Sequence, residues 1–119
     1  MYRILIVEDD EHQQMLYKEE LESEGYEVEL AGDGEVAIRK VEEKDYHLII
    51  LDIRMPRMDG IESLGKILDK KGDVPVILHT AYSSYKDSFM SWAADAYVVK
   101  SSNLDELKSK VKELLKGEK

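Results

Sequence analysis

Three short runs made only of apolar residues constrain the fold of this chain more than any other feature. They cover residues 4–7, 48–51 and 76–78, with the sequences Ile-Leu-Ile-Val, Leu-Ile-Ile-Leu and Val-Ile-Leu. A strand with no polar position has both of its faces covered, as in a parallel sheet that lies between two layers of helices. We therefore predict three central strands of a parallel sheet.

Two further runs predict the edges of this sheet. Residues 26–30, Tyr-Glu-Val-Glu-Leu, alternate apolar with acidic side chains. One face of such a strand meets water, which is typical of an edge strand. Residues 96–99, Ala-Tyr-Val-Val, are the candidate for the opposite edge.

The segments between the strands have the apolar spacing of helices. One helix is predicted over residues 11–24, ended by Gly25, and the last, over residues 104–115, has the clearest apolar face. Further helices are predicted around residues 36–41, 61–68 and 84–93, of which the last is the least periodic. This alternation predicts five β/α units with right-handed crossovers and helices on both faces of the sheet.

Length and charge narrow the class of protein. The 119 residues suffice for one domain, and 43% hydrophobic with 36% charged residues is a globular composition. The net charge of −9 disfavours nucleic acid and anionic membrane surfaces as partners. The chain has no cysteine and no charge-free stretch long enough to span a bilayer, so we expect a cytosolic protein.

Polar residues follow four of the predicted strands at the point where each strand ends. They are Glu8-Asp9-Asp10, Asp52, Thr80 and Lys100. Any one of them could simply end a strand, but ligands of such folds bind outside the carboxyl ends of the strands. Carboxylates that converge there repel one another unless a cation neutralises them, and Mg²⁺ is suited to carboxylate oxygens. The sequence therefore predicts a magnesium site.

Four segments of the chain carry a resemblance to a known family. They are residues 4–10 (Ile-Leu-Ile-Val-Glu-Asp-Asp), 51–60 (Leu-Asp-Ile-Arg-Met-Pro-Arg-Met-Asp-Gly), 80–81 (Thr-Ala) and 94–100 (Ala-Asp-Ala-Tyr-Val-Val-Lys). The chain resembles, over its whole length, a receiver domain of bacterial two-component response regulators. The resemblance implies an α/β, flavodoxin-like (βα)5 fold, a doubly wound parallel sheet with strand order 2-1-3-4-5. That order agrees with the edge strand predicted at residues 26–30.

The resemblance also implies the chemistry of the acidic residues. Asp52 matches the phosphoacceptor, which would take a phosphoryl group from a histidine kinase or a histidine phosphotransfer protein. Glu8 and Asp9 match the acidic pair of the Mg²⁺ site, in which Asp9, Asp52 and the Arg54 carbonyl would bind the ion and Glu8 would orient its waters. Asp10 is expected to cap the first helix instead.

Other positions match residues that contact the phosphoryl group or respond to it. Lys100 would supply a positive charge and Thr80 a hydroxyl donor, so we count both with Asp52 as the catalytic set. Thr80 and Tyr97 match a switch pair, in which the ring of Tyr97, partly exposed at first, would enter space that Thr80 vacates. Arg54 and Tyr82, two residues beyond Asp52 and Thr80, are expected to gate water and slow the dephosphorylation.

Two departures from the family leave an alternative open. The family usually has proline after its lysine, whereas this chain has Ser101, and Ala93 stands where a glycine is common. A cis bond before serine costs about 3 kcal/mol, so the loop at Ser101 is expected to be strained or to run differently. The alternative is a divergent receiver-like module that binds proteins without phosphorylation.

Other phosphate chemistry fits the sequence less well. Residues 60–66 match most of a P-loop, but Ile67 stands where the Mg²⁺-binding hydroxyl belongs. A phosphohydrolase would need an acid where Arg54 stands. The chain stops at Lys119, just after the last predicted helix, so we expect a single receiver domain over residues 1–119 with no output domain.

Overall fold

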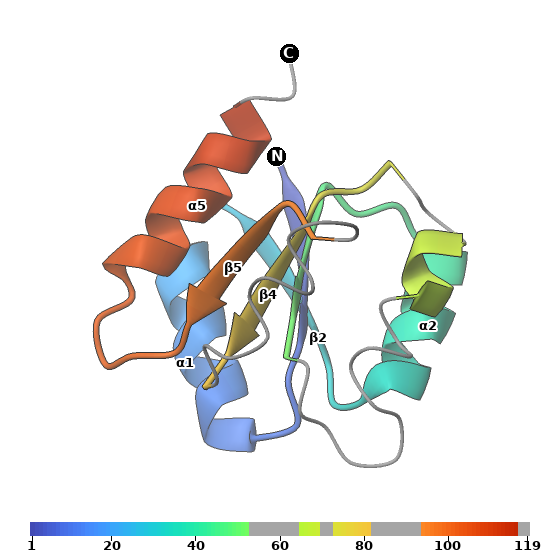
Figure 1. Cartoon of the computed structure of the whole chain (residues 1–119), viewed down its shortest axis with the longest axis horizontal. Coiled ribbons are helices and arrows are strands. Elements are labelled where there is room, and N and C mark those ends of the chain that lie inside the picture. The colour runs from blue at the N-terminus through green and yellow to red at the C-terminus, as the bar shows by residue number, and fades with distance from the viewer. Residues whose placement is uncertain (53–64, 70–72, 82–93, 117–119) are drawn as a thin grey trace.

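The apolar runs of the sequence form one parallel sheet. The computed structural model of the chain describes residues 1–52, 65–69, 73–81 and 94–116. Within these ranges the strands are β1 (Arg3–Val7), β2 (Glu27–Ala31), β3 (Leu48–Leu51), β4 (Val76–Thr80) and β5 (Ala96–Val99). All of them pair in parallel, in the order β2-β1-β3-β4-β5, which confirms the predicted topology (Figure 1).

Helices cover both faces of the sheet. Helices α1 (Glu11–Glu22) and α5 (Asp105–Lys116) lie on one side, and α2 (Gly34–Glu43) lies on the other (Figure 1). Residues 65–69 are also helical, whereas the rest of the helix predicted around 61–68, and all of the one around 84–93, lie outside the described residues. Over the described part of the chain, no helix has the length and apolar character that crossing a membrane requires.

The ends of α1 follow from local chemistry. The side chain of Asp10 accepts hydrogen bonds from the backbone N–H groups of His12 and Gln13, which confirms its predicted role as the N-cap. The helix ends at Glu22, two residues earlier than predicted. Gly25 follows with a φ of 98°, a left-handed conformation that favours glycine and turns the chain toward β2.

The strand side chains divide between two cores, one on each face of the sheet. Leu5, Ile49 and Leu78 belong to the core beneath α2, whereas Ile4, Ile50 and Ile77 belong to the core beneath α1 and α5. All six are at most 2% exposed. Burial on both faces explains why residues 4–7 of β1, all of β3 and residues 76–78 of β4 carry no polar side chain.

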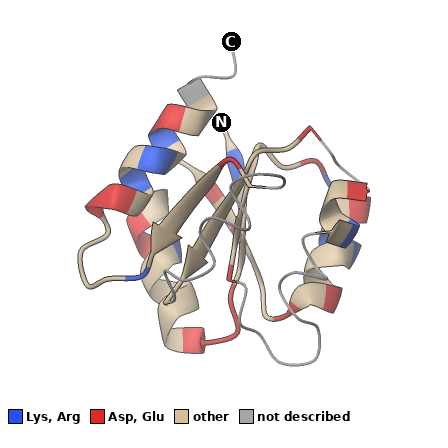
Figure 2. Ribbon diagram, in the orientation of Figure 1, with Lys and Arg blue, Asp and Glu red and all other residues tan. Residues whose placement is uncertain are grey.

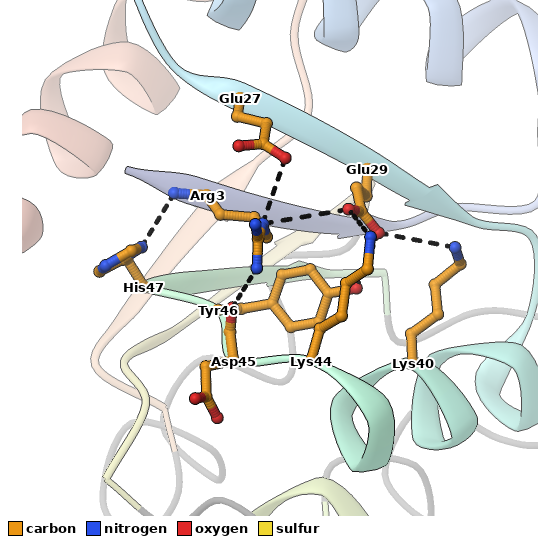
Figure 3. A network of polar contacts seen from close by, with 8 residues as sticks. All are labelled: Arg3, Glu27, Glu29, Lys40, Lys44, Asp45, Tyr46 and His47. Carbon is orange, nitrogen blue, oxygen red and sulfur yellow. Dashed lines mark hydrogen bonds and ion pairs between the residues drawn. The ribbon is translucent and has the colours of Figure 1, made fainter. Parts of the chain in front are cut away.

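The edge strand β2 is anchored by a network of charged side chains (Figure 3). The carboxylate of Glu29 accepts hydrogen bonds from Lys44 Nζ at 2.6 Å and from the Tyr46 hydroxyl at 2.9 Å. Arg3 donates to Glu27 at 3.2 Å. The side chain of Glu29 is 16% exposed, so the prediction that its face simply meets water is wrong there. The hydrogen bond from Lys44 lowers the pKa of Glu29 and keeps it charged.

Tyr46→Phe tests this network, because it removes a hydroxyl donor from Glu29 and leaves the buried ring in place. We expect the free energy of unfolding to fall by about 1 kcal/mol in urea titrations. Tyr26→Phe is the matched control, since the Tyr26 hydroxyl has no hydrogen bond to another described residue. It should stay within about 0.5 kcal/mol of the wild type. Equal losses in both variants would contradict the role of the Tyr46–Glu29 bond.

Candidate functional site

The polar residues that end β1, β3, β4 and β5 lie at one edge of the sheet. Val7 is in register with Leu51, and Thr80 is in register with Val99. Glu8, Asp52 and Lys100 therefore follow their strands on the same side of the molecule. Figure 2 shows acidic residues along the loop that leads from β1 into α1, and a basic stretch just after β5.

Three carboxylates converge at this edge. Glu8, Asp9 and Asp52 each offer an oxygen, and these atoms lie within 4.8 Å of one another. Glu8 is 2% exposed and Asp52 is 6% exposed, whereas Asp9 is exposed to solvent. The structure thus confirms that the predicted acidic residues lie close together. Two of them are buried and the third faces water.

The ammonium group of Lys100 lies between the two buried carboxylates. Its Nζ donates to Glu8 Oε1 at 2.8 Å and to Asp52 Oδ2 at 3.0 Å. Burial opposes the charge of Lys100, but the bonds to Glu8 and Asp52 outweigh it and raise the pKa of the lysine. Burial raises the pKa of Glu8 above its ordinary value, although the hydrogen bond from Lys100 acts in the other direction. Among the described residues, three carboxylates therefore lie beside one ammonium group.

Main-chain hydrogen bonds fix the residues that carry these groups. The N–H of Asp52 donates to the Val7 carbonyl at 3.1 Å, and the N–H of Lys100 donates to the Thr80 carbonyl at 2.6 Å. The N–H of Asp10 donates to Glu8 Oε2 at 3.2 Å. The sheet thereby continues for one residue past β3 and β5, and these added bonds fix the backbone from which each side chain extends.

The backbone of the loop after Lys100 is compatible with a serine at position 101. No peptide bond of the described residues is cis, so the Lys100–Ser101 bond is trans. The Ser101 hydroxyl donates to the Asn103 carbonyl at 2.8 Å and accepts the Asn103 N–H at 3.1 Å. The loop at Ser101 was expected either to hold a strained cis bond or to run differently from the family. The structure shows the second outcome. Lys100 nevertheless reaches both carboxylates.

Thr80 and Tyr97 are both in the interior. Thr80 is fully buried, and Tyr97 is 6% exposed and packs in the core beneath α2. The expectation of a partly exposed Tyr97 ring is therefore wrong for this structure. The reason is that Tyr97 pairs with Leu78 across β4 and β5, so its side chain points into the same core as that leucine.

Some predicted site residues lie outside the described residues, and one functional candidate was not predicted. Arg54 and Tyr82, the expected gate, fall in the undescribed ranges, as does Ala93. The unpredicted residue is Gln14, whose side-chain amide donates to the main-chain carbonyl of Glu8 at 2.5 Å. Contacts from a side chain to a main-chain oxygen six residues away leave no periodic signal in a sequence.

This combination of fold and site defines a class of protein. A parallel sheet in the order 2-1-3-4-5, with carboxylates and a lysine at its carboxyl edge, is the architecture of a receiver domain. The family model described as the response regulator receiver domain matches residues 4–112, and the chain belongs to that family.

Three relatives illustrate the match. The response regulator TrrA from Thermotoga maritima, in a crystal structure with Mg²⁺ and BeF, is 54% identical, with a TM-score of 0.90 over 96% of this chain and 99% of TrrA. A structure of TrrA in complex with the histidine kinase ThkA matches with a TM-score of 0.89. The transcriptional regulatory protein ZraR of Klebsiella oxytoca is 39% identical over 94% of this chain, and the response regulator ArlR of Staphylococcus epidermidis is 35% identical over 98%. The chain spans 26% of the length of ZraR and 53% of that of ArlR.

Crowding of like charges at the site has a measurable consequence. Asp9→Asn should raise the free energy of unfolding by about 0.5–1 kcal/mol in a metal-free buffer, because it removes a charge that repels Glu8 and Asp52. Glu11→Gln is the matched control, since it also removes one negative charge, but from the first turn of α1, where a negative charge is favourable. It should leave the stability unchanged or lower it. Stabilisation by Glu11→Gln of equal size would point to the net charge instead of the cluster.

Proposed function

We propose that this chain accepts a phosphoryl group on Asp52 from the phosphohistidine of a histidine kinase or a histidine phosphotransfer protein, and that the modified domain then switches its binding surface or relays the group. The observation that carries the proposal is the position of Lys100 Nζ, which contacts the buried carboxylates of Glu8 and Asp52 at once. The structure of the relative TrrA with a histidine kinase supports this class of donor. Transfer from such kinases takes place in the cytoplasm, and we propose that compartment.

The carboxylate cluster fits Mg²⁺. Its donors are hard oxygen atoms within 4.8 Å of one another, and the charge of Lys100 does not balance three carboxylates. Asp9 and Asp52 would hold the ion together with the main-chain carbonyl of Arg54, and Glu8 would orient its waters. When bound, Mg²⁺ neutralises charge on the carboxylate and phosphoryl oxygens. The relative TrrA was crystallised with Mg²⁺ and BeF, which supports this choice of metal.

The residues of this chain have distinct roles in the transfer. A carboxylate oxygen of Asp52 attacks phosphorus, and the new P–O bond forms as the P–N bond to the donor histidine breaks. Lys100 moves its ammonium group onto the phosphoryl oxygens, where it offsets the added negative charge. Thr80 donates its hydroxyl to the same group. Positioning and charge neutralisation do most of the catalytic work in such a transfer.

Thr80 and Tyr97 would convert this chemistry into a change of surface. When Thr80 moves toward the phosphoryl group, it would leave space that the buried ring of Tyr97 on β5 can fill. Because the ring is already buried in this structure, phosphorylation would act by shifting a population toward this arrangement. The partner that recognises this changed surface is an unidentified protein.

One further assignment completes the proposal. Arg54 and Tyr82 would cover the approach of water to the acyl phosphate and give it a long lifetime, as suits a relay.

Phosphoryl uptake is tested by intact mass and peptide mapping after incubation with Mg²⁺ and acetyl phosphate. The wild type should gain one phosphoryl group on the peptide that contains Asp52, and Asp52→Asn should gain none. Asp105→Asn, the same change in the first turn of α5, should react as the wild type does. A wild type without uptake would instead support a module that binds proteins independently of phosphorylation.

Switching is tested by amide hydrogen exchange with and without the phosphoryl group. Peptides that cover β4, β5 and Lys100 should become more protected on phosphorylation, because the Thr80 contact and the Tyr97 ring stabilise these strands. In Thr80→Ala the phosphoryl group should still be taken up, but the added protection of β5 should be lost. Protection confined to the surroundings of Asp52 would contradict the proposed coupling.

A further inference from the structure

Gln14 connects helix α1 to the carboxylate site. Its side-chain Nε2 donates to the main-chain carbonyl of Glu8, one residue past the end of β1. Gly32 lies alongside, since a Cβ atom built on that glycine would be 3.8 Å from Nε2. The amide of Gln14 thus lies between the loop that carries Glu8 and Asp9 and the loop that follows β2.

With the bond from Gln14, the main-chain N–H, the main-chain carbonyl and both carboxylate oxygens of Glu8 all have hydrogen-bond partners. The N–H of Glu8 donates to the Ala31 carbonyl at 3.0 Å, and its two carboxylate oxygens accept from Lys100 and from the Asp10 N–H. The carbonyl that Gln14 binds belongs to the peptide group that joins Glu8 to Asp9. Since a peptide group is planar, fixing its oxygen also fixes the direction in which the chain enters Asp9.

Asp9 depends on this restraint more than the other two acids. Glu8 and Asp52 are buried and both are bound by Lys100, whereas the side chain of Asp9 faces solvent. Its place in the cluster is set mainly by the backbone from which it extends. Mg²⁺ requires near-ideal octahedral geometry, so a ligand with a loose backbone weakens binding.

We propose that Gln14 is a positioning residue of the metal site, whose amide holds the Glu8–Asp9 peptide so that the Asp9 carboxylate stays within reach of Glu8 and Asp52. The inference rests on the proposed Mg²⁺ site and goes beyond it, since Gln14 itself touches neither the ion nor the phosphoryl group. The bond needs a donor: a side chain of the same length without an N–H fills the space but leaves the carbonyl unbound.

Gln14→Met is the direct test, because methionine keeps the length of the side chain and removes the donor. Gln13→Met is the matched control: Gln13 is the preceding residue of the same helix, and its amide oxygen accepts the Tyr17 hydroxyl at 3.0 Å. Mg²⁺ affinity is measured by calorimetric titration, and amide exchange of residues 8–11 is measured in metal-free buffer. Urea unfolding of both variants provides the stability reference.

Gln14→Met should raise the Kd for Mg²⁺ about tenfold, the low end of the losses seen when a residue that orients a metal ligand is removed. It should also speed amide exchange of residues 8–11 in the absence of the ion. Gln13→Met should lower the stability through the lost Tyr17 bond and keep the Kd within about twofold of the wild type.

The outcomes separate the two proposals. A wild type that does not bind Mg²⁺ would overturn the metal site, and with it this role for Gln14. A wild type that binds Mg²⁺, together with an unchanged Kd and unchanged exchange in Gln14→Met, would overturn the positioning role alone. Equal weakening of Mg²⁺ binding by both methionine variants would show that helix stability, and not the Gln14 bond, controls the affinity.

Discussion

The ion pairs of Lys100 are the interaction on which the carboxyl edge of this protein depends. Lys100 follows β5, and its partners Glu8 and Asp52 follow β1 and β3, so the contacts reach across β4 and connect the ends of three strands. Removing one partner of a buried pair costs about 3–5 kcal/mol, because the other charge is left uncompensated. The order of the sheet is what makes the contacts possible, since it places residues 92 and 48 positions apart beside one another.

At the same edge of the sheet, the requirements of stability and of function conflict. A folded chain gains little from three carboxylates in one place, and the cores on both faces of the sheet must supply the stability that the site does not. A cation and a phosphoryl group each change this balance of charge. A site whose described carboxylates outnumber its described cations is therefore suited to respond to both, which is what a phosphoacceptor requires.

Burial decided which features could be predicted from the sequence. The runs in β1, β3 and β4 are apolar because both faces of the sheet are covered, and the polar residues that end them mark the site. Glu29 was misjudged because the cations that neutralise it come from other segments, Lys44 among them. The burial of Tyr97 and the contact of Gln14 could not be predicted from the sequence either, since each depends on where the backbone places a side chain relative to a distant partner.

The charged network of β2 also affects how this protein behaves beside other copies of itself. Of the strands described, β2 pairs only with β1, so one side of its backbone is open to pairing with a foreign strand. A strand added there would approach Glu27 and Glu29, which already engage Arg3, Lys40 and Lys44. Charged side chains are a common protection of sheet edges against aggregation. The network that anchors β2 thus also places charged groups beside the open edge of the sheet, where they disfavour pairing with a second strand.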